Sequence, residues 1–203
     1  MTENFPLPIC IPVGNQKVGK VWTFSLPAVL TCPGSSRWCL RHCYARRIEK
    51  LRPNCRRAYM RNLALSLESD RFVKHVLNHL PEDAAQVRIH VGGDFYDVPY
   101  IQSWIRICEA RRQTLFWSYT RSWRIPPLLP DLEVLKSLPN VQLFASCDPG
   151  LPLPPASWRI AFIETDERAR GLPCPEQQNK LSSCKQCRYC FRNTQGNVVF
   201  KIH

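Results

Sequence analysis

The chain has 203 residues, of which 44% are hydrophobic and 22% are charged. This length fits a single domain over 1–203 with a core that folds without disulfides, and the aromatic content excludes a disordered chain. No apolar run approaches the roughly 20 residues that cross a bilayer, and the N-terminus lacks a secretory signal pattern. We therefore expect a cytoplasmic protein with no membrane partner. A formal net charge of +12 and eleven cysteines remain to be explained.

Short apolar segments and segments with helical spacing alternate along the chain. In chain order we predict a strand (Val21–Leu26), two helices (Leu40–Leu51 and Arg61–Leu80), a strand (Val87–Val91), a helix (Val98–Arg112), a strand (Leu115–Tyr119), a helix (Leu132–Leu138) and three strands (Val141–Ala145, Ile160–Ile163 and Val198–Ile202). Asp131 is the expected N-cap of the last helix. Strands that are apolar throughout are typical of parallel sheets covered by helices. The pattern predicts an α/β fold, namely a parallel sheet or incomplete barrel of six βα units with a cysteine-rich C-terminal loop.

Polar residues gather where the predicted strands end. Gly92, Gly93 and Asp94 follow the second strand, Arg121 follows the third, and Asp148 follows the fourth. In parallel α/β folds, functional sites form at the carboxyl ends of the strands. Strand ends also carry turn residues in any fold, but the set as a whole, together with a cysteine loop after the first strand, favours a site.

Three cysteines follow the first predicted strand. Cys32, Cys39 and Cys43 have the spacing C-x6-C-x3-C, and the last two share a face if the segment is helical. Thiolates are soft ligands for iron–sulfur clusters or zinc. A structural zinc site normally has four protein ligands, so three thiolates favour a [4Fe-4S] cluster with one open iron over zinc or unligated cysteines. Cys55 is an alternative fourth ligand.

The surroundings of this loop also bear on the state of its thiols. Arg37, Arg41 and His42 stand close to the three cysteines in the sequence. Because nearby cations favour the thiolate form, we expect these residues to lower the thiol pKa values.

A second cysteine group occupies the segment 174–190. The group comprises Cys174, Cys184, Cys187 and Cys190. The two consecutive x2 gaps are typical of ferredoxin-type cluster ligands, and four ligands close the site. A zinc ion held by four thiolates is the alternative. The predicted role is electron relay to the first cluster or attachment of the C-terminal loop.

The positive charge is concentrated in two regions. The first runs from Arg37 to Arg61 and has nine Lys or Arg residues against one acid, Glu49. Its candidate nucleic-acid contacts are Arg41, Arg46, Arg47, Lys50, Arg56 and Arg57. The second region comprises Arg106, Arg111, Arg112, Arg121 and Arg124. Arginines interleaved with aromatic residues suit phosphate contact and base stacking, whereas a solvated helix face or compensation for anionic clusters is the alternative.

Several segments resemble the phage and bacterial family called gene product 88. They are TFSLPAVLTCPG, the triplet CYA at Cys43–Ala45, HVGGDFYD and the later CPEQ…C..C..C pattern, and the resemblance extends from about Gly14 onward. The order of a cysteine loop, a Gly-Gly-acid strand end and βα units also resembles the core of radical S-adenosylmethionine enzymes. Their usual spacing is C-x3-C-x2-C and their usual acid is Glu, so this sequence departs from that pattern at both points.

The radical-enzyme resemblance implies specific ligands. Cys32, Cys39 and Cys43 would hold a [4Fe-4S] cluster, and Gly92, Gly93 and Asp94 would line S-adenosylmethionine. Reduction of the cluster would then cleave the cofactor to a 5′-deoxyadenosyl radical that abstracts a hydrogen atom. The resemblance also implies an external reductant such as a ferredoxin or a flavodoxin, and the host cytoplasm as the location if the gene belongs to a phage.

Three functions are therefore expected to compete. The first is a radical S-adenosylmethionine-type enzyme with an auxiliary cluster that acts on nucleic acid or a nucleotide. The second is a non-catalytic iron–sulfur or zinc protein that binds nucleic acid. The third is a small electron-transfer protein.

Overall fold

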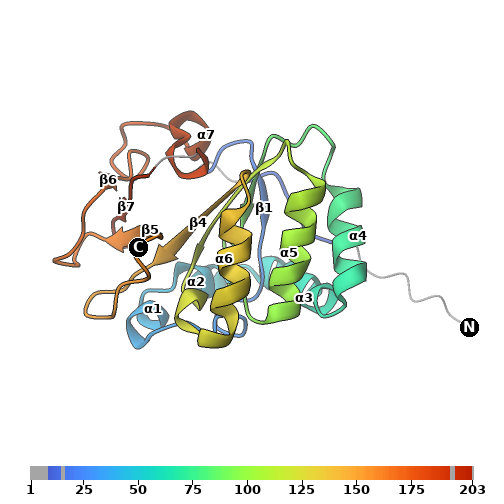
Figure 1. Ribbon diagram of the computed structural model, residues 1–203, viewed down its shortest axis with the longest axis horizontal. Helices are drawn as coiled ribbons and strands as arrows, with labels where there is room; N and C mark the ends of the chain where they lie inside the picture. The colour runs from blue at the N-terminus through green and yellow to red at the C-terminus, as the bar shows by residue number, and fades with distance from the viewer. Residues whose placement is uncertain (1–8, 15–16, 193–194, 203) are drawn as a thin grey trace, which may run out of the picture.

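A computed structural model describes residues 9–14, 17–192 and 195–202. The described chain contains a parallel sheet of seven strands in the order β1-β2-β3-β4-β5-β7-β6 (Figure 1). The strands are β1 (Trp22–Phe24), β2 (Gln86–Ile89), β3 (Leu115–Thr120), β4 (Val141–Ser146), β5 (Arg159–Ile163), β6 (Leu172–Pro173) and β7 (Val198–Phe200). The sheet has two edges, formed by β1 and β6.

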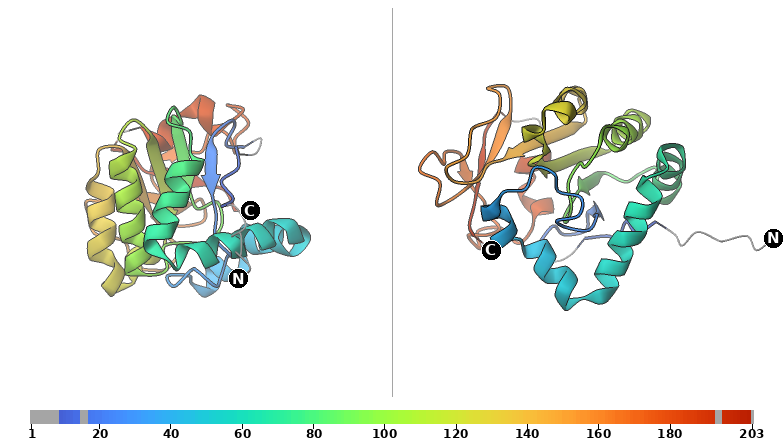
Figure 2. Two further views of the ribbon diagram at one scale, coloured as in Figure 1. Left: turned by 90° about the vertical axis from the view of Figure 1, so that its right-hand side faces the viewer. Right: turned by 90° about the horizontal axis from the view of Figure 1, so that it is seen from below.

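Helices cover one face of this sheet. The α-helices are α1 (Arg37–Arg41), α2 (Tyr44–Leu51), α3 (Pro53–Ser66), α4 (Ser69–His79), α5 (Val98–Ala110), α6 (Leu129–Ser137) and α7 (Cys184–Cys187). Short 3-10 helices are η1 (Ser122–Arg124), η2 (Pro126–Leu128) and η3 (Tyr189–Phe191). Figure 2 shows α4, α5 and α6 as a row on one side of the sheet. No helix in the described ranges is long and apolar enough to cross a membrane.

The predicted α/β class and parallel pairing are confirmed. Each of the six predicted strands is present, and the two-residue strand β6 was not predicted. The expectation of six βα units is wrong, because the connection from β4 to β5 contains no helix. This connection includes the proline-rich segment 148–155, whose prolines lack the backbone donors that a helix needs.

Two of the predicted helices are broken into pairs. The segment Leu40–Leu51 contains the end of α1 and all of α2, separated at His42 and Cys43. Ser36 caps α1 by accepting a hydrogen bond from the backbone N–H of Cys39. The break lets the chain turn between the second and third cysteines, so these two residues do not share one continuous helix face.

The predicted helix Arg61–Leu80 divides at Leu67 and Glu68 into α3 and α4. The Ser66 hydroxyl donates to the carbonyl of Leu63 at 2.8 Å, a local hydrogen bond of a kind that competes with helix continuation. The last predicted helix also begins earlier than expected, at Leu129, so Asp131 lies in the first turn and is not the N-cap.

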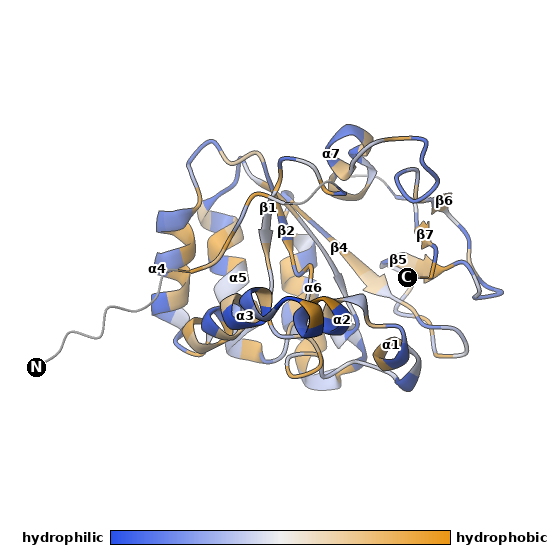
Figure 3. Cartoon of the chain, turned by 180° about the vertical axis from the view of Figure 1, so that it is seen from behind, coloured by the Kyte–Doolittle hydropathy of each residue, from blue (hydrophilic) through white to orange (hydrophobic). Residues whose placement is uncertain are grey.

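The face of the sheet away from α4, α5 and α6 positions the site. On β2, the side chains of Val87 and Ile89 enter the core against the helices, and the alternation of the strand turns Arg88 to the opposite face. Figure 3 shows that α2 and α3 cross the molecule as seen from behind, with hydrophilic stretches along both helices. The second face of the sheet therefore lies between these helices and the C-terminal segment.

Candidate functional site

Both cysteine groups open onto a single cavity of about 440 Å³. We call Cys32, Cys39 and Cys43 the first cysteine set, and Cys174, Cys184, Cys187 and Cys190 the C-terminal cysteine set. All seven line this cavity, and all are free thiols. Figure 1 places α1, which carries Cys39, and α7, which begins and ends on Cys184 and Cys187, at opposite ends of the sheet. The cavity therefore joins two thiol sets that are far apart in sequence.

A network of charged side chains holds the loop that carries the first cysteine set. Arg121, at the carboxyl end of β3, donates from Nε and from its terminal nitrogen to Asp148 Oδ1, at 3.0 and 2.7 Å. Asp148 also accepts the hydroxyl of Ser36, the cap of α1, at 2.5 Å. At Gly34 a Cβ atom would meet the carbonyl oxygen of Arg121 at 2.1 Å, so only glycine permits this approach. The ends of β3 and β4 thus fix the loop.

Asp94 joins the same network. Its Oδ1 accepts hydrogen bonds from the Thr120 hydroxyl and the Phe95 backbone N–H, and its Oδ2 accepts from the backbone N–H of Arg121. Asp94 is buried, and this burial raises the pKa of its carboxyl group despite these hydrogen bonds. The residue lines the cavity as predicted, but three protein donors already occupy much of its acceptor capacity.

The glycine pair before Asp94 is explained largely by the protein's own packing. Gly93 has a φ of +81°, and a Cβ atom there would meet the Leu26 Cβ at 2.6 Å and the Thr31 hydroxyl at 2.7 Å. The carbonyl oxygen of Gly92 accepts a hydrogen bond from the backbone N–H of Leu26. Both glycines line the cavity, so they are compatible with a ligand there without requiring one.

The thiols of the first cysteine set differ in their surroundings. Burial raises the pKa of Cys32 to about 12 and that of Cys39 to about 11. The predicted lowering by Arg37, Arg41 and His42 is wrong for these two thiols, because desolvation outweighs nearby charge and the cation acting on Cys39 is Arg121. Cys43 sits at the N-cap of α2, where its Sγ accepts the backbone N–H of Arg46 at 3.4 Å.

The C-terminal cysteine set is anchored by the N-terminal part of the chain and by β3. The backbone N–H of Cys184 donates to the carbonyl of Lys17 at 2.9 Å. The Tyr119 hydroxyl on β3 is hydrogen-bonded to Cys190, yet burial raises the pKa of this thiol to about 12. Phe191 packs on Trp117 with ring centroids 5.0 Å apart, which seats η3 against the sheet.

The four remaining cysteines lie away from the cavity lining. Cys108 is fully buried in the core, as predicted. Burial raises the pKa of Cys10, while the charge of Arg61 lowers it and that of the neighbouring Cys55 raises it. Neither Cys10 nor Cys55 lines the cavity. Cys147 is buried beside the end of β4. Nothing in this arrangement favours Cys55 as a fourth ligand of the first cysteine set.

The donor chemistry of the cavity can be tested against a metal centre. Across the described ranges, no three His, Cys, Asp or Glu side chains stand close enough to share one metal ion. All seven thiols nevertheless line one cavity. Thiols are soft donors, so the chemistry of the lining fits a metal–thiolate group, whose binding would release the thiol protons.

The first basic region forms an exposed surface. All six predicted nucleic-acid contacts are exposed: Arg41, Arg46, Arg47, Lys50, Arg56 and Arg57. We call these six residues the basic helical face. None of them takes part in the ion pairs formed by the described residues. The acid among them, Glu49, is buried and accepts the backbone N–H of Ala28 at 2.7 Å.

The second basic region does not form such a surface. Arg121 pairs with Asp148, and Arg106 pairs with Asp70 at 2.8 Å. Arg111 donates to the carbonyl of Leu77, and Arg124 donates to that of Gly34. Because four of its five arginines have partners within the protein, this region is a structural feature.

Sequence reasoning missed Arg88 and left the role of His90 open. Arg88 lines the cavity at mid-strand, and its signal was a charge inside an otherwise apolar strand. The Nε2 atom of His90 is hydrogen-bonded to the Tyr100 hydroxyl at 2.8 Å. The backbone of His90 has a φ of +64°. Burial, aided by the charge of Arg88, lowers the pKa of His90 to about 3, so the imidazole is neutral near pH 7.

The fold and the cavity together define a parallel α/β protein with two sets of thiols on one site. The sequence model of the gene product 88 family matches residues 12–170, so the chain belongs to the gene product 88 family. The gene 88 protein of Mycobacterium phage L5 is 27% identical over 220 aligned positions, which cover 92% of this chain and 89% of that relative. The gene 88 protein of Mycobacterium phage D29 is 26% identical over 219 positions with the same coverage. No solved structure matches the chain.

Proposed function

We propose that this protein is an iron–sulfur enzyme of the radical S-adenosylmethionine type that acts on nucleic acid or a nucleotide. The first cysteine set would hold a [4Fe-4S] cluster with one open iron, and the C-terminal cysteine set would hold an auxiliary cluster, with zinc as the alternative ion there. The observation that supports this proposal is the shared cavity, since seven thiols from both ends of the chain line it.

The placement of the two sets supports different roles for them. The first set has three thiols beside Gly92, Gly93 and Asp94 at the carboxyl ends of the strands, where parallel α/β folds bind ligands. The C-terminal set has four thiols, which suffice to close a site. An incomplete barrel over the whole chain 1–203 is part of this proposal. The row of α4, α5 and α6 on one face of the sheet is consistent with it (Figure 2), as is the cavity lined by Arg88 on the other face.

The chain's own residues would position the reacting groups. When bound, the cluster and S-adenosylmethionine supply one-electron reductive cleavage and hydrogen-atom abstraction, with the electron coming from a reductant of the ferredoxin or flavodoxin class. Arg121 and Asp148 would hold the cysteine loop in place through Ser36. The second acceptor site on Asp94 Oδ2 is available to an ammonium group of the cofactor, because that oxygen accepts one hydrogen bond from the protein.

A nucleic-acid substrate is supported by the basic helical face. Its cations are exposed and lie on α1, α2 and α3, and the opposite sides of α1 and α2 line the cavity through residues such as Trp38, Tyr44 and Ile48. A polyanion bound on this face would therefore lie beside the cavity mouth. The engagement of Asp94 by three protein donors favours the second candidate, a non-catalytic iron–sulfur or zinc protein that binds nucleic acid.

Cleavage of S-adenosylmethionine separates these two candidates. Anaerobically reconstituted protein is incubated with dithionite and S-adenosylmethionine, and 5′-deoxyadenosine is quantified by chromatography. We expect formation by the wild type, loss to background in Cys32→Ala, and retention in Cys55→Ala, a matched control outside the cavity. No product from an iron-loaded wild type would contradict the enzymatic proposal and leave the non-catalytic candidate.

A further inference from the structure

The floor of the cavity carries a buried cation. Arg88 lies on β2, whose alternation places it on the cavity face of the sheet. Its Nε atom is fully buried and has no hydrogen-bond partner among the described residues. Arg88 is also absent from the ion pairs that the described residues form. Its guanidinium is hydrogen-bonded to the Tyr44 side chain on α2, which is a phenol and not a carboxylate. A buried guanidinium without a carboxylate partner is costly, so the structure presents a positive charge that an anionic group would stabilise.

The surroundings of Arg88 point toward the C-terminal cysteine set. Its guanidinium carbon lies 5.3 Å from the centroid of the Tyr119 ring. The hydroxyl of that tyrosine is hydrogen-bonded to Cys190. Cys184 and Cys190 both line the cavity together with Arg88. The geometry therefore connects this arginine to the C-terminal cysteine set.

The charge of the expected centre matches this cation. Four thiolates around a zinc ion, or around a [4Fe-4S] core of charge +2, leave a net charge of about −2. Such a centre in a desolvated cavity needs compensating charge. Phe191 and Val198 at this end of the cavity are apolar and buried. Two other cations act on this set, but Lys17 pairs with Glu176, and Arg159 donates to the carbonyl of Gly196 and to Gln142. Arg88 has no carboxylate partner among the described ion pairs and is therefore suited to act as a counter-ion.

We propose that Arg88 is the built-in counter-ion of an anionic metal–thiolate centre on the C-terminal cysteine set. The inference rests on the proposed function, since it requires that this set bind a metal. An anionic group of a substrate is the competing partner for the same charge. The contact between Tyr119 and Cys190 favours the metal centre, because it places the arginine and the thiol on the same aromatic side chain.

The test uses the full chain with Cys32, Cys39 and Cys43 replaced by Ser, so that only the C-terminal set can bind metal. Iron with sulfide, or zinc, is loaded anaerobically, and the rate of metal loss to EDTA is measured. We expect Arg88→Gln to lose metal about tenfold faster and Arg88→Lys to stay near the parent rate, because lysine keeps the charge. If the centre contains iron, the midpoint potential of Arg88→Gln should fall by about 59 mV, a tenfold change for a one-electron couple.

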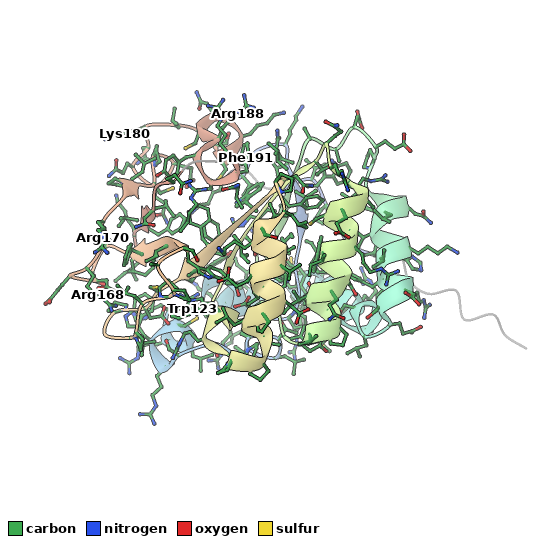
Figure 4. The ribbon with its side chains drawn as sticks, in the orientation of Figure 1. Trp123, Arg168, Arg170, Lys180, Arg188 and Phe191 are labelled. Atoms are coloured by element: carbon green, nitrogen blue, oxygen red, sulfur yellow. The ribbon has the colours of Figure 1, made fainter. Side chains whose placement is uncertain are left out.

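Controls make the outcome specific. Arg188→Gln removes an exposed charge next to α7 (Figure 4) and should leave metal loss and potential unchanged. Arg88→Met, which buries no unpaired amide, supplies the neutral variant if Arg88→Gln does not fold. Unchanged metal loss in the neutral variants, or equal defects in Arg88→Lys, would overturn the inference alone. Weakened binding of a mononucleotide with unchanged metal loss would assign the charge to a substrate. A parent protein that binds no metal would overturn the proposed function itself.

Discussion

His90 illustrates how a single residue near the site is tuned by its position. Its imidazole is buried, and its pKa is lowered from 6.5 to about 3. A depressed pKa in the folded state means that the unfolded chain binds the proton more readily, so this residue's contribution to stability is present above pH 6.5 and is lost as the pH falls toward 3.

This gives a prediction for pH-dependent stability. Between about pH 6.5 and 3, protonation linked to His90 should lower the free energy of unfolding by about 1.4 kcal/mol per pH unit. Asparagine tolerates the left-handed backbone of this position, so His90→Asn should show a shallower pH dependence in urea unfolding at pH 7, 6 and 5. Parallel slopes for the two proteins would show that His90 titrates normally in the folded state.

At the scale of elements, the buried pair of Arg121 and Asp148 joins two strand ends to the cysteine loop. The side chain of Asp148 is 1% exposed and that of Arg121 is 22% exposed. Removing one partner of a buried pair leaves an uncompensated charge, so Asp148→Asn should reduce the free energy of unfolding by about 3 kcal/mol in urea denaturation. Asp70→Asn breaks the exposed pair with Arg106 and should have little effect. Equal effects of the two changes would contradict the role of the network.

The helices α1, α2 and α3 give the second prediction at this scale. Neutralising Arg46, Arg47 and Lys50 together with Gln should weaken retention on single-stranded DNA or RNA and flatten its dependence on salt, because fewer counterions are released on binding. Fluorescence anisotropy across a salt series measures both quantities. A matched triple variant, Lys74→Gln with Arg112→Gln and Arg170→Gln, removes three exposed charges elsewhere and should retain wild-type binding. Equal losses in both variants would indicate an effect of overall charge only.

Elements also show what sequence patterns convey. Apolar strand patterns are local, and they predicted the parallel sheet well. Helix breaks at His42 and Leu67 depend on how successive helices turn across the sheet, which apolar spacing does not encode. The candidate cysteines were recognisable by their spacing. Arg88 and the pairing of Arg121 with Asp148 were not, because their roles depend on contacts between strands that are distant in sequence.

For the whole molecule, α1 of the first cysteine set and α7 of the C-terminal cysteine set lie at opposite ends of the sheet (Figure 1). One cavity joins the two sets, and the buried cation Arg88 belongs to its lining. The basic helical face lies beside the first set. This organisation relates the two unusual features of the composition, because seven of the eleven cysteines line the cavity and the exposed cations of the basic helical face lie on α1, α2 and α3, of which α1 and α2 also contribute to its lining. The account therefore depends on whether these thiols bind inorganic iron.

Iron and acid-labile sulfide in anaerobically purified protein measure this most directly. If the protein holds two [4Fe-4S] clusters, we expect about eight iron and eight sulfide per chain, together with the visible absorbance typical of iron–sulfur proteins. Replacing the three cysteines of the first set with Ser should leave about four of each. Folded, colourless protein that contains neither iron nor sulfide after anaerobic purification and reconstitution would contradict the account.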